Sequence, residues 1–556
     1  MVATPQPYPA MKDSGVPCLG EVPEGWEVLK VREARALTRE NEYLTKYFAD
    51  SAGKKGGEFY SPAEVVRLLV QITKPLAGNT VYDPTVGSGG FLIQSHQYVE
   101  EQGQNANDLA LYGQDSNGTV WSICNMNLIL HNITRFTIEN GDTLEDPLLL
   151  ENGQVRKFDR VLANPPFSQN YSRASVKYSN RFREWCPETG KKADLMFVQH
   201  MLASLKPGGR MATVMPHGVL FRGGKEKLIR ELFIEDDCIE AIISLPPGLF
   251  YGTGIPACVL VCHKQKPDAL RDQILFINAD REYGEGKAQN KLRPEDIEKI
   301  DFVFSHKREL AKYSRLVSKA EIADEHDYNL NIRRYVDNTP DPEPEDVQAH
   351  LLGGIPQAEI DALASQFDQF GVSAGRLFQP ERPGYCAFVE AIDRKAAIKD
   401  VLEADAALAQ TLAHHHEVLA SWWTGARDDF ALLENAHNGE RKTPDVRQQL
   451  ISSLKQKLTP LGVLDEFKAA GVFVNWWPSS SSPRPTPSRR WRRALPRSRP
   501  SWTRPWKPPW TWRPTSPRKT TRTRRSPPPS SRKPSRTPST TSRTRSATPP
   551  PENATP

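Results

Sequence analysis

The run Asn164-Pro165-Pro166-Phe167 carries the most specific chemical signal in the sequence. It follows the segment 158–163, whose apolar residues predict a buried strand. Two consecutive prolines at the end of a strand fix the backbone and remove N–H donors, so the carbonyls point to one place. The Asn164 side-chain oxygen and the Pro165 carbonyl can accept the two hydrogens of an amine, which favours an sp3-like nitrogen, and Phe167 can stack on a planar ring. The run predicts a site that methylates an amine or amide nitrogen.

Three acidic residues follow three earlier strand-like runs, at the positions where a parallel sheet binds a cofactor. Asp83 opens the segment Asp83–Gly90, in which the glycines let the backbone approach a ligand closely. Asp115 can bind ribose hydroxyls, and Asp142 can accept a hydrogen bond from an adenine amino group. Each acid by itself also suits a helix cap or a turn. The glycine segment alone also suits NAD, another nucleotide or a plain turn, although it is not a P-loop. Together they favour a nucleoside-containing cofactor.

These residues require a sheet whose strands end at one edge. Strand-like runs alternate with helical stretches over about 200 residues, which predicts a doubly wound α/β domain. The predicted strands are 80–82, 109–112, 136–138, 160–163, 211–215, 239–244 and 257–262. Predicted helices are 119–130 and 194–205, the second ended by a turn at 206–209. Another helix is predicted to begin at Ser61-Pro62-Ala63-Glu64, with Ser61 as its cap and Glu64 completing a capping box.

Several segments, in this order, resemble the modification subunits of type I restriction-modification systems. They are Gly57–Pro62, Asp83–Gly90, Gly113–Asp115, Gly141-Asp142, Asn164–Phe167, Leu205–Arg210 and Gly252–Pro256, and the resemblance runs from about Tyr43 to Trp477. It implies a Rossmann-like class I methyltransferase sheet, S-adenosyl-L-methionine as the cofactor, and a site-specific DNA-methyltransferase that acts on adenine N6. A base in a duplex would be flipped out to reach the site, at a cost of a few kcal/mol.

The resemblance also implies roles for individual residues. The catalytic group would be Asn164, Pro165, Pro166 and Phe167. The cofactor would be contacted at its methionine end by Phe59, Tyr60 and Pro62, with Asp83, Gly87, Ser88 and Gly89 around it, at its ribose by Asp115, at its adenine by Asp142, and also by Asn164. Val86 stands where the family often has cysteine. No metal site is expected, because the seven cysteines form no CxxC pair and His414–His416 point around a helix.

Four segments are expected along the chain. Residues 1–40 form a poorly structured, fused or truncated N-terminus, in which 11–28 resembles the opening of a type I specificity subunit. Residues 41–340 form the S-adenosylmethionine-dependent methyltransferase domain, and 341–475 a mainly helical region for subunit contacts. The resemblance implies DNA, a specificity subunit, a second modification subunit and a restriction subunit as partners. An apolar stripe from Ile398 to Trp423 could pack on the same chain or on a partner helix.

Residues 478–556 differ in composition from the rest of the chain. They hold 20 prolines, 17 arginines and one acidic residue, which predicts a disordered tail. The tail could be an arm that binds nucleic acid, or the product of a frameshift in a GC-rich gene. The remainder of the chain holds 53 basic and 66 acidic residues, so its body is acidic. A partner is therefore expected to supply much of the grip on DNA phosphates.

Composition places the chain in a reducing compartment. The cysteines are odd in number and scattered, the start lacks the apolar core of a secretory signal, and no apolar run could span a membrane. A cytoplasmic protein is expected. Two alternatives to an active DNA methyltransferase remain open. One is a truncated remnant or scaffold that binds cofactor without activity. The other is an enzyme that methylates a glutamine side chain or RNA adenine, since the same chemistry serves them.

Overall fold

The computed structural model describes residues 61–477, apart from 168, 191, 251–253, 287–288, 340–345 and 436–442. It also describes two short antiparallel strands, β1 (Met11–Asp13) and β2 (Glu21–Pro23). The predictions for Phe59, Tyr60, the remainder of residues 1–40 and the tail 478–556 lie outside the described residues.

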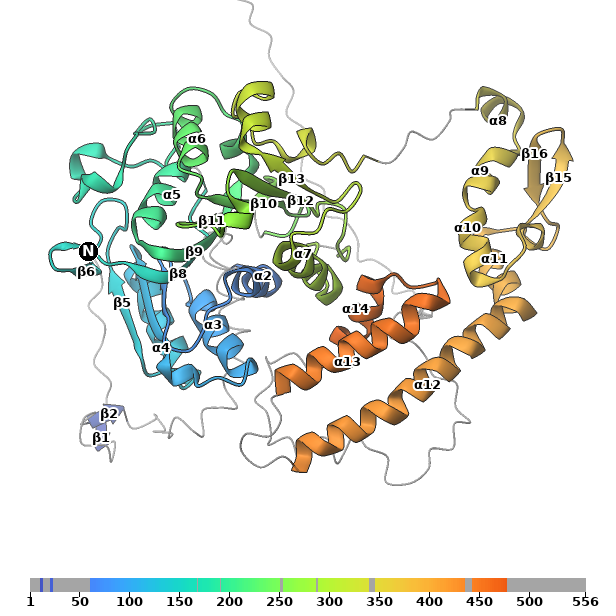
Figure 1. The fold of residues 1–556 in the computed structure, drawn as a ribbon, viewed down its shortest axis with the longest axis horizontal. Helices are drawn as coiled ribbons and strands as arrows, with labels where there is room; N and C mark the ends of the chain where they lie inside the picture. Colours follow the sequence, from blue (N-terminus) through green and yellow to red (C-terminus); the bar gives the residue numbers. More distant parts are fainter. Residues whose placement is uncertain are drawn as a thin grey trace, which may run out of the picture. The chain divides into compact units, whose positions relative to one another are not determined.

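A nine-stranded mixed sheet organises residues 80–318, with the order β13-β12-β10-β11-β9-β8-β3-β4-β5 (Figure 1). Its strands are β3 (Thr80–Asp83), β4 (Ala110–Asp115), β5 (Phe136–Asn140), β8 (Phe158–Ala163), β9 (Leu205–Pro216), β10 (Ile239–Ser244), β11 (Ala257–His263), β12 (Gln273–Asn278) and β13 (Ser314–Ser318). Neighbours from β9 to β5 are parallel, as are β10 and β12, whereas β11 and β13 run antiparallel to their neighbours. All seven predicted strands overlap a strand of this sheet. A separate hairpin joins β6 (Leu150–Glu151) and β7 (Gln154–Val155).

Helices cover both faces of the sheet, which confirms the doubly wound α/β prediction. One buried cluster includes α2 (Ala63–Thr73), α3 (Gly90–Glu101), α4 (Gly118–Leu130) and α7 (Pro294–His306). The other includes α5 (Asp194–Ala203) and α6 (Lys225–Glu235). Strand residues alternate between the clusters: Leu162 of β8 belongs to the first, and its neighbours Val161 and Ala163 belong to the second. This alternation follows from the two-residue period of a strand.

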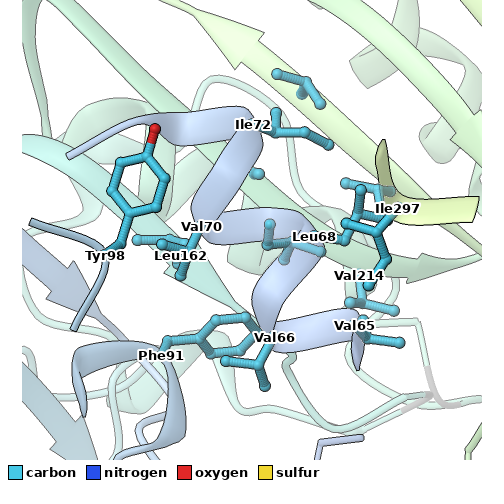
Figure 2. Close-up of a cluster of buried hydrophobic side chains, with 14 of the residues drawn as sticks. Val65, Val66, Leu68, Val70, Ile72, Phe91, Tyr98, Leu162, Val214 and Ile297 are labelled. Carbon is cyan, nitrogen blue, oxygen red and sulfur yellow. The ribbon is translucent and has the colours of Figure 1, made fainter. Parts of the chain in front are cut away.

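Helix α2 illustrates how spacing produces burial. Val65, Leu68, Leu69 and Ile72 recur at helical spacing, and all four are completely buried. Figure 2 shows the α2 side chains among those of neighbouring elements, namely Phe91 and Tyr98 of α3, Leu162 of β8, Val214 of β9 and Ile297 of α7. The predicted helix therefore forms because its apolar stripe closes one face of the sheet.

The predicted start of α2 is wrong in one respect. The helix begins at Ala63, with Pro62 in the cap position and no side chain capping it. The Pro62 carbonyl accepts hydrogen bonds from the amides of Val65 and Val66, both at 3.0 Å. The Ser61 hydroxyl, which was expected to cap, instead bonds to Asn164. A tertiary partner has replaced the local one.

The predicted turn at 206–209 does not end a helix. Helix α5 ends at Ala203, two residues earlier than predicted, and β9 begins at Leu205. The extra residues form a bulge within β9, because the register against β8 shifts from Phe158 opposite Leu205 to Arg160 opposite Arg210. Gly208, with φ +70°, allows this bend. The same glycine and proline signals serve a bulge as well as a turn.

The C-terminal region is mainly helical, as predicted. Its helices are α8 (Val347–Leu352), α9 (Gln357–Ala362), α10 (Ala364–Phe370), α11 (Lys395–Glu403), α12 (Ala406–Asn435), α13 (Thr443–Leu458) and α14 (Glu466–Trp476). A small sheet of β14 (Ile355–Pro356), β16 (Tyr385–Phe388) and β15 (Phe378–Arg382) was not predicted.

Helices α12, α13 and α14 share a third apolar cluster. Leu419 and Trp423, from the predicted stripe of α12, pack against it, whereas Leu412 is 48% exposed. The C-terminal part of the stripe therefore packs on its own chain.

Helix α14 also contacts α7. Asn475 of α14 donates to the Glu295 carboxylate of α7 at 2.9 Å, and the Phe302 and Phe467 rings meet edge to face. Within the described residues, no helix is both long and apolar enough to cross a bilayer.

Candidate active site

Four adjacent parallel strands bring the predicted site residues to one edge of the sheet. The order β8-β3-β4-β5 means that the segments after these strands meet where the strands end. Hydrogen bonds join these segments directly. The amides of Gly87 and Gly141 donate to Asp115, to its carboxylate Oδ2 and its backbone oxygen respectively, both at 3.0 Å. The Thr143 hydroxyl donates to the Pro84 carbonyl at 2.5 Å.

The glycine segment after β3 approaches its neighbours closely. Gly87 and Gly89 have φ of +54° and +84°, a region that favours glycine. Gly89 stands at the N-terminus of α3, where a Cβ would lie 3.0 Å from the Cys124 sulfur. Ser88 is held through its carbonyl, which accepts from the Asn127 side chain of α4 at 2.9 Å. Glycine at position 87 therefore allows this backbone conformation, and at position 89 it also allows close packing on α4.

Asp83 is buried and only partly satisfied. Its Oδ1 accepts from the Thr85 amide at 3.0 Å, whereas Oδ2 is buried and has no hydrogen-bond partner among the residues that the structure describes. Burial raises the pKa of Asp83 to about 8. An unmatched buried acceptor is costly unless another donor reaches it. Asp83 therefore suits a ligand that brings a donor or a positive charge.

Asp115 and Asp142 each hold their own turns. Asp115 accepts from the amides of Gly87 and Asn117, and burial raises its pKa. Asp142 Oδ1 accepts from the amides of Leu144 and Glu145, at 2.8 and 3.0 Å. A carboxylate oxygen carries two lone pairs, so both acids keep acceptor capacity for a ligand.

Asn164 is held by a residue that the sequence analysis treated only as a helix cap. Its Nδ2 donates to the Ser61 hydroxyl at 3.0 Å, so Oδ1 is the end of the amide left to accept from a substrate. Pro165 is buried, and Phe167 is half-buried with its ring edge-on to Phe250 at 6.2 Å. The signal for Ser61 was its place in the motif that includes Pro62.

The structure therefore gathers most of the predicted site residues and leaves two unplaced. Pro62 adjoins Ser61 at the start of α2, and the glycine segment, Asp115, Asp142 and the 164–167 run lie at the shared edge. Phe59 and Tyr60 lie outside the described residues. The edge combines the Asn164 side-chain oxygen, a half-buried aromatic ring and three acids.

Comparisons with known proteins point to one family. The chain is 34% identical over 350 residues to the type I restriction enzyme MjaVIII methylase subunit of Methanocaldococcus jannaschii, covering 60% of this chain and 58% of that protein. It is 35% identical over 337 residues to the MpnII methylase subunit of Mycoplasma pneumoniae, covering 58% and 61%. The chain thus spans about 60% of the length of these relatives.

A solved structure agrees. The crystal structure of a type I restriction-modification system methyltransferase subunit from Streptococcus thermophilus matches with a TM-score of 0.51 and 36% identity, covering 56% of this chain and 66% of that one. The sequence model of the N-6 DNA Methylase family matches residues 33–343, more than half of the chain. The chain belongs to the N-6 DNA methylase family.

Proposed function

We propose that this chain transfers a methyl group from S-adenosyl-L-methionine to N6 of adenine in DNA, as the modification subunit of a type I restriction-modification system. The observation that carries the proposal is the edge that strands β8 and β3 share. There, Asn164 and Pro165 follow β8 and the glycine segment follows the neighbouring strand β3, in a chain that belongs to the N-6 DNA methylase family. The named relatives are methylase subunits of type I restriction enzymes.

The residues at the edge fit this cofactor. The unmatched Oδ2 of Asp83 suits the positively charged methionine end, where Phe59, Tyr60, Pro62, Gly87, Ser88 and Gly89 also belong. Asp115 would accept from the ribose hydroxyls and Asp142 from the adenine amino group. When bound, the cofactor supplies a sulfonium methyl group.

The chain itself prepares the nucleophile. The lone pair of the adenine amine is delocalised into the ring, which makes the nitrogen a poor nucleophile. Asn164 Oδ1 and the Pro165 carbonyl would accept its two hydrogens and favour an sp3-like nitrogen with an available lone pair, and N6 would release one of these hydrogens as a proton when it takes up the methyl group. Phe167 stacks on a base flipped out of the duplex. Such preorganised acceptors act at the point where charge develops.

Partners complete the proposed enzyme. We assign cofactor binding and transfer to residues 41–340, and subunit contacts to 341–475. DNA, a specificity subunit, a second modification subunit and a restriction subunit are the expected partners, in the cytoplasm. The acidic body suits this division, since a specificity subunit would read the sequence and supply phosphate contacts.

Calorimetry with S-adenosylmethionine, followed by transfer of labelled methyl groups to DNA with and without a cognate specificity subunit, tests the proposal. We expect binding by the chain and transfer in the complex. Binding without transfer under both conditions would instead favour an inactive, cofactor-binding remnant.

Asn164→Ala should abolish transfer while cofactor binding survives, because the substitution removes an acceptor for N6. The control is Asn107→Ala, an exposed residue that precedes β4 and should leave transfer unchanged. Transfer near the wild-type rate in Asn164→Ala would refute the assigned role.

A further inference from the structure

A buried arginine outside the predicted site lies behind the Asp142 turn. Arg181 belongs to the loop that follows Phe167, and it is only 7% exposed. Its Nη1 donates to the Thr143 carbonyl at 2.9 Å, and its Nη2 donates to the Leu144 carbonyl. These are the two residues that directly follow Asp142. The guanidinium thus binds the backbone carbonyls of this turn, whereas Asp142 Oδ1 binds its backbone amides.

The positive charge of Arg181 has an unusual environment. In the part of the chain that the structure describes, no carboxylate forms an ion pair with it. Its neighbours are backbone carbonyls, the Phe182 ring at 4.5 Å and the imidazole of His200. Burial lowers the pKa of Arg181 to about 10, which leaves it protonated at neutral pH. Burying a cation without an ion pair is costly, so the carbonyl bonds and the nearby charges of Asp142 and Asp146 must compensate it.

A hydrogen bond to His200 links Arg181, through Tyr82, to the start of the glycine segment. Arg181 Nη1 lies 2.6 Å from His200 Nδ1, and a guanidinium can only donate. Nδ1 must therefore accept, so the neutral imidazole carries its hydrogen on Nε2, which lies 3.1 Å from the Tyr82 hydroxyl. Burial and the charge of Arg181 lower the pKa of His200 well below its ordinary value, in keeping with the neutral form. Tyr82 immediately precedes Asp83.

These contacts join three segments that the proposed site needs. Arg181 is in the loop after the Asn164–Phe167 run, Thr143 and Leu144 follow Asp142, and Tyr82 precedes Asp83. Thr143 is bonded in turn to Pro84 of the glycine segment. We propose that Arg181 is a positioning residue that clamps the Asp142 turn against the glycine segment and so sets the affinity for the adenine end of the cofactor. The proposal rests on the role proposed for Asp142.

Arg181→Met keeps most of the side-chain volume and removes the guanidinium group that donates to the two carbonyls. We expect the dissociation constant for S-adenosylmethionine to rise about ten-fold or more, which corresponds to ~1.4 kcal/mol per ten-fold step. Turnover at saturating cofactor should change little. Arg181→Lys, which keeps the charge but lacks the planar guanidinium that reaches the Thr143 and Leu144 carbonyls through separate nitrogens, should show an intermediate loss and serves if the Met variant fails to fold.

The chain offers a matched control in Arg230. It is 3% exposed, and its guanidinium also donates to carbonyls, those of Val219, Arg222 and Tyr328, none of which adjoins the proposed site. Arg230→Met should lower the thermal midpoint as Arg181→Met does but leave cofactor affinity unchanged. Equal losses of cofactor affinity in the two variants would mean that Arg181 contributes only to the overall stability of the fold, which would overturn the proposal.

A double-variant cycle shows whether Arg181 acts through Asp142. In an Asp142→Ala background, Arg181→Met should cause little further loss of affinity, because the group being positioned is gone. Additive losses would overturn the proposal.

Hydrogen exchange tests the clamp without any cofactor. The Leu144 and Glu145 amides, which donate to Asp142, should exchange faster in Arg181→Met and remain protected in Arg230→Met. Unchanged exchange would overturn the clamp. If the wild-type chain fails to bind S-adenosylmethionine, the proposed function is wrong. Hydrogen exchange at Leu144 and Glu145 would still show whether Arg181 holds the Asp142 turn, because it needs no cofactor.

Discussion

At the scale of single residues, the orientation of one amide governs the proposed chemistry. An asparagine side chain has a carbonyl end and an NH2 end, and only the carbonyl can accept the hydrogens of an amine. Ser61 Oγ accepts from Asn164 Nδ2 at 3.0 Å, which leaves the carbonyl as the end of the amide available to the proposed substrate. With the amide reversed, the NH2 group of Asn164 would face the amine of the proposed substrate, and two donors would oppose each other.

Ser61→Ala should lower kcat about five-fold, because one hydrogen bond contributes ~1 kcal/mol to holding the amide. Ser61→Thr, which keeps the hydroxyl, should restore most of the rate. Steady-state kinetics at saturating cofactor measures the effect. The control is Ser95→Ala in α3, whose buried hydroxyl has no hydrogen-bond partner within the described part of the chain. An unchanged kcat in Ser61→Ala would contradict the orienting role.

Asp83 should make cofactor binding depend on pH. Its pKa of about 8 means that the carboxyl is mostly protonated at neutral pH. A bound cation favours the carboxylate and lowers this pKa, so binding releases a proton, and affinity should rise as the pH increases toward 8. Calorimetry at pH 7 in buffers of different ionisation enthalpy measures the released proton. Asp83→Asn should lose that contribution, and equal proton release in both proteins would contradict the assignment.

At the scale of elements, β4 and the glycine segment are fitted to each other at Gly113. A Cβ on Gly113 would lie 2.8 Å from a methyl carbon of Val86 and 3.0 Å from Ile138 of β5. Contacts this short force a shift of the segment. Glycine at this position therefore sets how closely the glycine segment lies against the sheet.

Gly113→Ala should lower the free energy of unfolding by about 1–3 kcal/mol and weaken cofactor binding, since the strand would push Val86 away. Denaturant titration and calorimetry measure the two effects. Adding Val86→Ala should recover part of both losses. Gly223→Ala, with open space around its Cβ, is the control. A neutral Gly113→Ala would show that the segment accommodates the methyl group.

At the scale of the whole molecule, the C-terminal helices contact the region of the nine-stranded sheet through α7. Besides the Asn475–Glu295 bond, Arg447 of α13 lies 3.6 Å from the Glu298 carboxylate. Gly471 of α14 packs closely on Glu295, where a Cβ would approach within 2.6 Å. Phe473, 1% exposed, anchors the cluster between Trp422 and Trp477.

Phe473→Ala should destabilise this cluster by about 3–5 kcal/mol, because it leaves a cavity the size of an aromatic ring. Tryptophan fluorescence during denaturant unfolding reports the loss, since two tryptophans contact the ring. Leu412→Ala, at an exposed position of α12, should change stability by less than about 0.5 kcal/mol. Similar effects from both variants would contradict the packing.

Much of the fold could be predicted because its signals are local. Thr80–Tyr82 and Arg160–Ala163 read as strands from consecutive residues, and both lie within strands of the sheet. The Lys206–Gly209 segment misled because glycine and proline mark a bulge as readily as a turn. The small sheet from β14 to β16 was missed because its strands are only two to five residues long.

By itself the sequence determined the alternation of strands and helices and the placement of Asp83, Asp115, Asp142 and Asn164 at strand ends. Those features depend on residues that are neighbours in the chain. Only the tertiary structure decided that Ser61 binds Asn164, 103 positions away, and that Arg181 holds Thr143, 38 positions away. A buried donor takes whichever acceptor the packed elements bring within reach, and no local pattern records that choice.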